Sequence, residues 1–349
     1  MSLSLLAPGE MPELLDFLKR LPLDVRPENL TQFWMPRTTA GGSATSILVL
    51  REAGTIIASI GWIDVPLRIN DDQGHARTGE RHKSIRWPVN FYVLAELRGK
   101  GLGHRLLEAT RDGATLRAAI GGAIKLLERT GFRSTISLVC ARWVRPCLDP
   151  ARLGERLRGG ERRPPPDLAS WRIDGALVRA RRLRRFDVAL PWADRSSRGA
   201  PGEAGVPRDA AYLEFAFGGV LGPYHASYVV DVDGTPAGHF VLAARAGRRF
   251  LLVAEIVDLD AMPGREKEVI EAARRTALAC ADMARLRISG ARFTRVLEGT
   301  TRGIVTDQTL RIVCDEPWGS PPADWRMTYG DHDHYRARAS SLAWRTGDH

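Results

Sequence analysis

A basic, glycine-rich segment of the chain carries the residue types that bind phosphate groups. Residues 98–104 read Arg-Gly-Lys-Gly-Leu-Gly-His, and they follow the strand-like residues 91–94. Leu102, Leu106 and Leu107 recur at helical spacing, so we expect a helix to begin inside the turn. The first N–H groups of a helix have no partner within it, and the helix dipole favours negative charge there. The segment therefore predicts an anion-binding turn, with an ordinary glycine turn as the alternative.

The elements around this turn are expected to form an α/β unit. Residues 11–21 predict a helix, and the apolar runs on either side of the turn at 52–54 predict a β-hairpin. Pro88, in the strand before the glycine turn, predicts a bulge or an edge position, because proline cannot donate a hydrogen bond to a ladder. The expected strands are 46–51, 55–69, 85–94 and 135–144, and a further helix is expected at 123–129, ending before Gly131.

The second half of the chain repeats this order of elements. Two strands, a third strand, a long helix, a short strand, a short helix and a last strand follow one another. Their expected ranges are 226–232, 238–244, 250–259, 266–283, 286–289, 292–297 and 309–314. Two halves with one order of elements indicate a duplicated fold. We therefore expect domains at 1–150 and 207–349, separated by an Arg- and Pro-rich linker or crossover at 151–206.

Composition limits the classes of protein to which the chain can belong. Of its 349 residues, 44% are hydrophobic and 26% are charged, which is typical of a globular chain and not of a disordered one. No run reaches the ~18 apolar residues that span a bilayer, and no secretory leader is recognisable. The four cysteines form no CxxC pair, which indicates reduced thiols and no zinc site. We expect a cytoplasmic protein with no membrane partner.

The net charge of +10 raises the question of nucleic-acid binding. Most of the excess positive charge lies between Arg152 and Arg185, a segment that contains 11 arginines and four acidic residues. An arginine-rich segment can bind phosphate, and its affinity would fall steeply with salt. A solvated connector is the expected interpretation of this segment, so we expect no nucleic-acid partner.

The glycine turn resembles that of a known superfamily when it is taken with the segment that follows it. The pattern Arg-x-x-Gly-x-Gly stands at 98–103, after a strand, and Ala-Ile-Lys-Leu-Leu-Glu-Arg-Thr-Gly-Phe follows at 123–132. Together they resemble the GNAT superfamily of acyl-CoA-dependent N-acetyltransferases, and the resemblance extends over about residues 5–145. The Gly-Lys-hydroxyl order of a Walker-type loop and a GxGxxG fingerprint after the first strand are both missing.

This resemblance implies a fold and a co-substrate. Each half would be a mixed, mostly antiparallel twisted sheet flanked by helices, an α/β (α+β) architecture in tandem. Acetyl-CoA would bind without a metal, its pyrophosphate on the amides of the turn and its pantetheine arm along the preceding strand. A backbone N–H near Val93 would stabilise the oxyanion, and alignment of the two reactants would supply much of the rate. The residues implied in coenzyme A binding are Phe91, Tyr92, Val93, Arg98, Gly99, Lys100, Gly101, Leu102, Gly103 and His104.

Two positions that carry proton-transfer groups in this superfamily are apolar here. Trp87 stands where a carboxylate or histidine often serves as base, and Leu127 stands where a tyrosine often serves as acid. We therefore predict the base nearby, with Glu80 and His82 as catalytic candidates and Asp64 beside them. A surface or structural role is the alternative for each. Trp87 and Asp64 are the candidate substrate-binding residues, and plain core packing is the alternative for Trp87.

The second half keeps the order of elements but lacks the phosphate turn. With Val257 aligned to Val93, the segment 262–267 falls under 98–103. Both key glycines are replaced, and Pro263 removes an amide donor. We therefore expect a degenerate repeat that does not bind coenzyme A.

Several polar residues of the second half invite a chemical role. Glu255 follows a run of apolar residues, and a buried carboxylate must be paired or have a raised pKa. It is a third candidate for the general base, in a cleft shared by the two halves, and pairing with a structural partner such as Arg287 is the alternative. His225 and His239 lie among strand residues and are expected to be structural. The run 331–334 alternates Asp and His, but it offers no third ligand site, so no metal is expected.

These observations predict a tandem-domain N-acetyltransferase whose second domain shapes the acceptor site. The acceptor would be a primary amine of a small molecule or amino sugar, which attacks the thioester directly in a ternary complex. The alternative is a non-catalytic CoA-binding sensor or assembly protein, which the apolar Trp87 and Leu127 favour. The sequence carries no signal for the oligomeric state.

Overall fold

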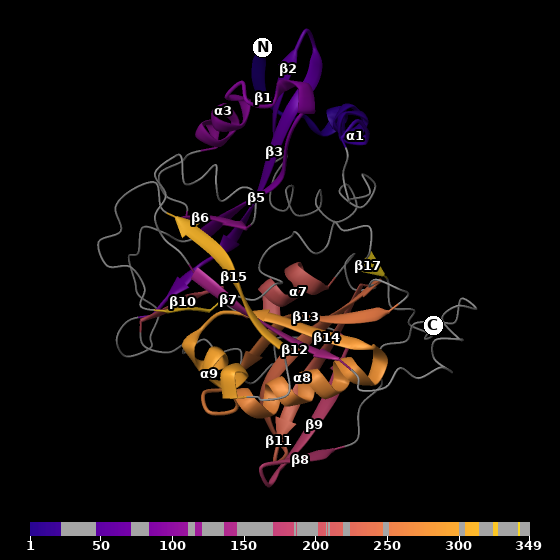
Figure 1. Cartoon of the computed structure of the whole chain (residues 1–349), viewed down its shortest axis with the longest axis vertical. Helices are drawn as coiled ribbons and strands as arrows, with labels where there is room; N and C mark the ends of the chain where they lie inside the picture. Colours follow the sequence, from indigo (N-terminus) through magenta and orange to yellow (C-terminus); the bar gives the residue numbers. More distant parts are fainter. Residues whose placement is uncertain are drawn as a thin grey trace, which may run out of the picture.

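The computed structural model describes segments from both halves of the chain, and Figure 1 shows their arrangement. The described residues are 1–21, 47–70, 84–110, 116–120, 136–144, 170–184, 186, 202–206, 208, 210–218, 224–246, 251–299, 304–313, 324–326 and 341–342. Among them, no helix is long and apolar enough to cross a membrane.

Most of the described strands belong to one continuous, 14-stranded sheet that is mostly antiparallel. Its order is β1-β2-β3-β5-β6-β15-β7-β14-β13-β12-β11-β9-β8, and β17 pairs with β12. Only β5–β6 and β13–β14 pair in parallel within it. The strands are β1 (Ser2–Leu5), β2 (Ile47–Glu52), β3 (Thr55–Pro66), β5 (Ser84–Val93), β6 (Leu116–Ile120), β7 (Ile136–Val144), β8 (Trp171–Ile173), β9 (Ala176–Leu183), β11 (His225–Val232), β12 (Thr235–Ala246), β13 (Leu252–Ala261), β14 (Met283–Ile288), β15 (Ile304–Val313) and β17 (Ser341–Leu342). A second sheet joins β16 (Asp324–Arg326), β10 (Glu203–Gly205) and β4 (Arg68–Ile69). The predicted α+β class with a mixed, mostly antiparallel sheet is confirmed.

One strand of each half lies within the sheet of the other half. Strand β15, late in the chain, pairs with β6 of the first half, while β7 of the first half pairs with β14 of the second. The two exchanged strands also pair with each other, Ile304 opposite Arg142 and Leu310 opposite Ile136. The two halves therefore share hydrogen-bonded ladders and cannot separate without breaking them.

Two helices cover the two sides of the N-terminal strands (Figure 1). These are α1 (Met11–Lys19) and α3 (Leu102–Ala109), and each buries an apolar stripe at helical spacing. Both faces of β2 are covered, since all four residues from Ile47 to Leu50 are buried. The buried residues of the helices are Leu14, Phe17 and Leu18 on α1 and Leu102, Leu106 and Leu107 on α3.

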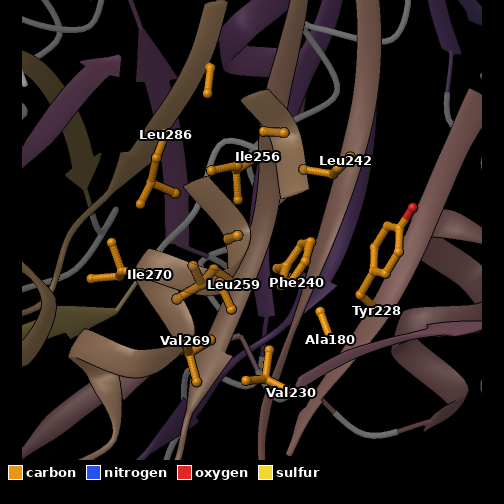
Figure 2. Packing of buried hydrophobic residues seen from close by; sticks show 14 of the residues in the cluster. Ala180, Tyr228, Val230, Phe240, Leu242, Ile256, Leu259, Val269, Ile270 and Leu286 are labelled. Carbon is orange, nitrogen blue, oxygen red and sulfur yellow. The ribbon is translucent and has the colours of Figure 1, made fainter. Parts of the chain in front are cut away.

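The C-terminal strands pack against α8 (Glu266–Cys280) and α9 (Ala291–Gly299) on one face. Figure 2 shows Val269 and Ile270 of α8 against Phe240 and Leu259 of the sheet. The opposite face of β11–β13 belongs to the same hydrophobic cluster as α7 (Ala210–Phe217) and the N-terminal strands. The hydrophobic core is therefore continuous from one half to the other.

The elements predicted on described residues are present in the predicted order, but the predicted strand 55–69 divides into β3 and β4 of different sheets. Strands β1, β6, β10, β16 and β17 and helix α7 were not predicted from the sequence. The expected helix at 11–21 is α1, and the expected hairpin is β2–β3. Strands β8 and β9 fall inside the segment 151–206, predicted as a linker or crossover, and they form the sheet edge beside β11. The predicted helix 123–129, residues 152–169 of the arginine-rich segment and the run 331–334 lie outside the described residues.

Candidate functional site

Strand β5 diverges from its parallel neighbour soon after it begins. It pairs with β3 along almost its whole length, but with β6 only at Ile85–Arg86. Pro88 lies just beyond this last pair, and a bulge at residues 90–91 follows it opposite Ile60. The strand thus shows both features that Pro88 predicted, a bulge and a place with a single neighbour.

The edge of β5 that faces away from β3 offers backbone groups for hydrogen bonding. The Leu94 N–H donates to the Ile57 carbonyl at 3.1 Å, so Leu94 points its polar groups towards β3. Alternation along an antiparallel strand then turns the N–H and C=O of Val93 to the opposite edge. The Arg98 Nε–H donates to this Val93 carbonyl at 3.3 Å. The Val93 N–H lies beside it, on the edge where an extended ligand would pair.

The glycine turn that follows β5 requires a left-handed backbone at two positions. Gly99 has a φ of 83° and Gly101 a φ of 78°, a region that side chains with a Cβ rarely adopt. A Cβ placed at either glycine would meet no atom within 4 Å, so the turn is open on its outer side. The glycines therefore set the shape of the turn and leave room in front of its amides.

The amides of this turn are unpartnered within the described part of the chain. Helical hydrogen bonding in α3 begins with the Arg105 N–H, which donates to the Gly101 carbonyl at 3.1 Å. Gly101 is the N-cap residue, and no side chain caps the helix. The N–H groups of residues 99–104 have no acceptor among the described residues, and Arg98 and Lys100 are exposed beside them. An uncapped, basic helix start is an anion-binding arrangement.

Tyr92 is the titratable group of β5 closest to the turn. Its side chain is half-buried, and burial raises the pKa of the phenol above its usual 10.0. Phe91 and Val93 are half-buried on either side, and all three pack at the margin of the N-terminal core. The phenol therefore stays protonated at neutral pH, as a donor on the strand that leads into the turn.

The equivalent turn in the second half is filled by the chain's own groups. Only residues 262–265 separate β13 from α8, whereas residues 94–101 separate β5 from α3. The Gly264 N–H donates to Glu266 Oε2 at 2.9 Å, and the Arg265 N–H donates to the Met262 carbonyl at 2.9 Å. Arg292 donates to the other oxygen of Glu266 at 3.0 Å. The Met262 N–H donates to the Ala237 carbonyl as well, so the amides of this turn are used within the chain, although no side chain caps α8 itself.

Of the residues predicted as general base or as acceptor-binding, two lie outside the described part of the chain and two lie on β3 and β5. Glu80 and His82 lie outside the described residues. Asp64 lies on β3 opposite Arg86, and Trp87 lies on β5 opposite Ile63, so both backbone positions are on the two strands that lead to the site.

Glu255 lies on β13, and four strands of the sheet separate it from β5. Its Oε1 accepts hydrogen bonds from Arg245 at 2.9 Å and Arg285 at 3.0 Å, and its side chain is 1% exposed. The partners are therefore these two arginines, where the sequence suggested Arg287. Sequence reasoning missed both, although the alternation Met-Ala-Arg-Leu-Arg-Ile at 283–288 was a signal for charged groups on one face of a strand.

The buried pair of His239 and Asp258 has the composition of a catalytic dyad but no access for a substrate. His239 Nε2 lies 2.9 Å from Asp258 Oδ2, and Arg208 donates to the other carboxylate oxygen at 3.0 Å. All three side chains are at most 1% exposed. His225 likewise contacts the Phe217 carbonyl at 3.2 Å. Both histidines are structural, as predicted. No cluster of metal-binding side chains occurs among the residues the structure describes.

Comparisons with solved structures agree with this architecture. The chain superposes on a GCN5-related N-acetyltransferase from Anabaena variabilis with a TM-score of 0.56 at 9% identity, covering 99% of this chain and 86% of that one. One from Kribbella flavida gives a TM-score of 0.54 at 14% identity, covering 89% and 70%. A probable N-acyltransferase from Enterococcus faecalis gives 0.51 at 12% identity, covering 89% and 72%. Neither a protein-family model nor a curated protein sequence matches the chain. The chain therefore has the fold of the GCN5-related N-acetyltransferases.

Proposed function

We propose that the chain is a cytoplasmic, acetyl-CoA-dependent N-acyltransferase that transfers an acetyl group to a primary amine. The observation that carries the proposal is the turn at 99–104, which follows the strand β5. Among the described residues, the amides of this turn have no acceptor and the end of β5 has no neighbour other than β3. The fold of the GCN5-related N-acetyltransferases supports it. The second half, in whose corresponding turn Glu266 accepts a hydrogen bond from the Gly264 N–H, would be a degenerate repeat that helps to shape the acceptor site.

The residues present fit a diphosphate and an extended pantetheine arm. The amides of 99–104 would hold the two phosphates, and Lys100 and Arg98 would add positive charge. The open edge of β5 would pair with the amide groups of the pantetheine arm. Acetyl-CoA would supply an activated thioester, which a neutral amine can attack without a further cofactor. Among the chain's own groups, the Val93 N–H would stabilise a developing oxyanion beside that edge.

The acceptor proposed from the sequence is a small-molecule amine or amino sugar, bound in a ternary complex. The proton of the attacking amine would pass to Glu80, His82 or water, because Trp87 occupies the position on β5 where a base is expected. Asp64 and Trp87 would line the acceptor side. In this arrangement the protein contributes chiefly by aligning the two reactants.

A non-catalytic, CoA-binding sensor is the second candidate, favoured by the apolar residues Trp87 and Leu127. One experiment separates it from the enzyme. Titration calorimetry measures coenzyme A binding, and release of free thiol from acetyl-CoA is followed with a panel of primary amines. The enzyme predicts both binding and amine-dependent thiol release, whereas the sensor predicts binding without release for every amine. Absence of binding would contradict both.

A further inference from the structure

A row of charged side chains crosses the junction between the two halves of the sheet. Glu255 on β13 is paired in register with Arg285 on β14, and Arg285 is paired with Arg142 on β7. Arg245, on β12, reaches the same carboxylate from the other side. Cross-strand partners share a face, so these four side chains gather on one side of the sheet. They come from both halves, since β7 is the exchanged strand of the first half.

The row contains more positive charge than its own acid can compensate. Glu255 accepts from Arg245 and Arg285 through a single oxygen, Oε1. Within the described part of the chain, no carboxylate lies within ion-pair distance of Arg142, which stands directly opposite Arg285. Like charges directly opposite one another on neighbouring strands destabilise a sheet. Three guanidinium groups against one carboxylate leave an excess of two positive charges.

Burial makes this excess of positive charge costly, and several hydrogen-bonding groups of the row have no partner among the described residues. The side chains of Arg245 and Arg285 are 14% and 19% exposed, so solvent screens them poorly. The Nε–H groups of Arg142, Arg245 and Arg285 are buried and have no hydrogen-bond partner. Glu255 Oε2 is also buried without a partner. The row therefore offers three unused donors and one unused acceptor, and such groups cost free energy unless something satisfies them.

We propose that this cluster binds an oxyanion group, a carboxylate or a phosphate, on the amine acceptor. Guanidinium groups match the planar, two-oxygen geometry of such anions and hold them with charge-assisted hydrogen bonds. An O–H or N–H group next to the anion would satisfy Glu255 Oε2. The assignment of the anion to the acceptor rests on the proposed acyltransferase function, whereas the anion site itself does not. It also gives Glu255 a binding role in place of the role of general base.

Inorganic phosphate is the probe for the site itself. Thermal unfolding of the full chain is measured with increasing phosphate, and chloride keeps the ionic strength constant. The measurements are made in the Gly101→Val variant as well, so that binding at the glycine turn does not contribute. Phosphate is expected to raise Tm, and Arg142→Gln is expected to raise Tm without phosphate and to abolish this part of the response. Arg285→Gln should abolish it too.

Arg274→Gln is the matched control, because Arg274 is a half-buried arginine of the same half that is already paired with Glu271. It should retain the whole phosphate response. A phosphate response in Arg142→Gln equal to that of the unaltered chain would overturn the proposal. So would a fall in Tm on replacing Arg142 in the absence of phosphate, because it would show that the charge of the cluster is already balanced.

A pair of acceptors tests the link to the reaction. Thiol release is compared for an amine that carries a carboxylate and for its methyl ester. The unaltered chain should prefer the acid, and Arg142→Gln should weaken this preference about tenfold through KM, with kcat little changed. Equal rates for acid and ester, with phosphate binding intact, would overturn the assignment to the acceptor. No thiol release with any amine would refute the acyltransferase while the phosphate result stood by itself.

Discussion

Each half of the chain contains a β-hairpin, a further strand and a helix in that order, β2-β3-β5-α3 and β11-β12-β13-α8, yet the two helix starts differ in chemistry. In both halves a bulged strand leads into a helix, at β5–α3 and at β13–α8. The start of α3 has left-handed glycines, exposed basic residues and amides that nothing caps. The start of α8 is shorter, and Glu266 occupies it. A ligand site at this place therefore depends less on the fold than on whether the chain's own acceptors occupy the amides of the turn.

The largest effect is expected at Gly101, in the turn that is proposed to hold coenzyme A. Gly101→Val is expected to weaken coenzyme A binding about a thousandfold, or roughly 4 kcal/mol, because about three amide hydrogen bonds to the diphosphate are lost. Gly54→Val is the matched control, since Gly54 also has a positive φ, of 84°, and open space around it. Both variants carry similar backbone strain. Equal affinities in calorimetry would remove the turn from the site.

The next effect concerns the second half and its buried charges. Glu255→Gln is expected to destabilise the chain by about 3 kcal/mol, because Arg245 and Arg285 lose the carboxylate that pairs with them. Urea unfolding in a chloride buffer measures the change, and coenzyme A affinity should be unaltered. A loss of turnover without a loss of stability would instead restore Glu255 as a catalytic base.

A smaller effect is expected at Glu266, in the turn before α8. Glu266→Ala is expected to cost about 1–2 kcal/mol, since Gly264 loses its acceptor and Arg292 loses its nearest carboxylate. Urea unfolding again provides the value. The variant should gain no affinity for coenzyme A, because Pro263 has no N–H and the turn is too short. A gain in affinity would show that Glu266 alone prevents the second half from binding coenzyme A.

The smallest effect is a pH dependence of stability at high pH. The folded state raises the pKa of Tyr92, so it holds the phenolic proton more tightly than the unfolded chain does. The stability that this gives is present below the usual pKa of 10.0 and is lost as pH rises towards the folded pKa. Tyr92→Phe should flatten this part of the unfolding profile above about pH 10. An unchanged profile would contradict burial of the phenol.

The sequence could predict those features that depend only on residues close together in the chain. The turn at 98–104 was found because its glycines, basic residues and helix start are contiguous. The exchange of β7 and β15 was not predicted. It pairs Arg117 with Val313, and no pattern in the residues around either position specifies such a distant partner.

The charged row on the sheet shows the same limit at the level of single residues. The partner suggested for Glu255 was Arg287, which lies on the correct face but two residues from Arg285. Alternation along a strand fixes the face of a side chain, whereas the parallel register between β13 and β14 fixes its neighbour. No role was predicted for Arg142 from the sequence, because it is the only charged residue of β7. Only the fold brings it opposite Arg285.

Amide hydrogen exchange with and without coenzyme A tests the contrast between the two helix starts most directly. Coenzyme A is expected to slow exchange at residues 99–104 strongly, because these amides then donate to the diphosphate. Residues 264–267 should exchange at the same rate in both conditions. Protection of both turns, or of neither, would contradict the claim that only the glycine turn before α3 holds the co-substrate.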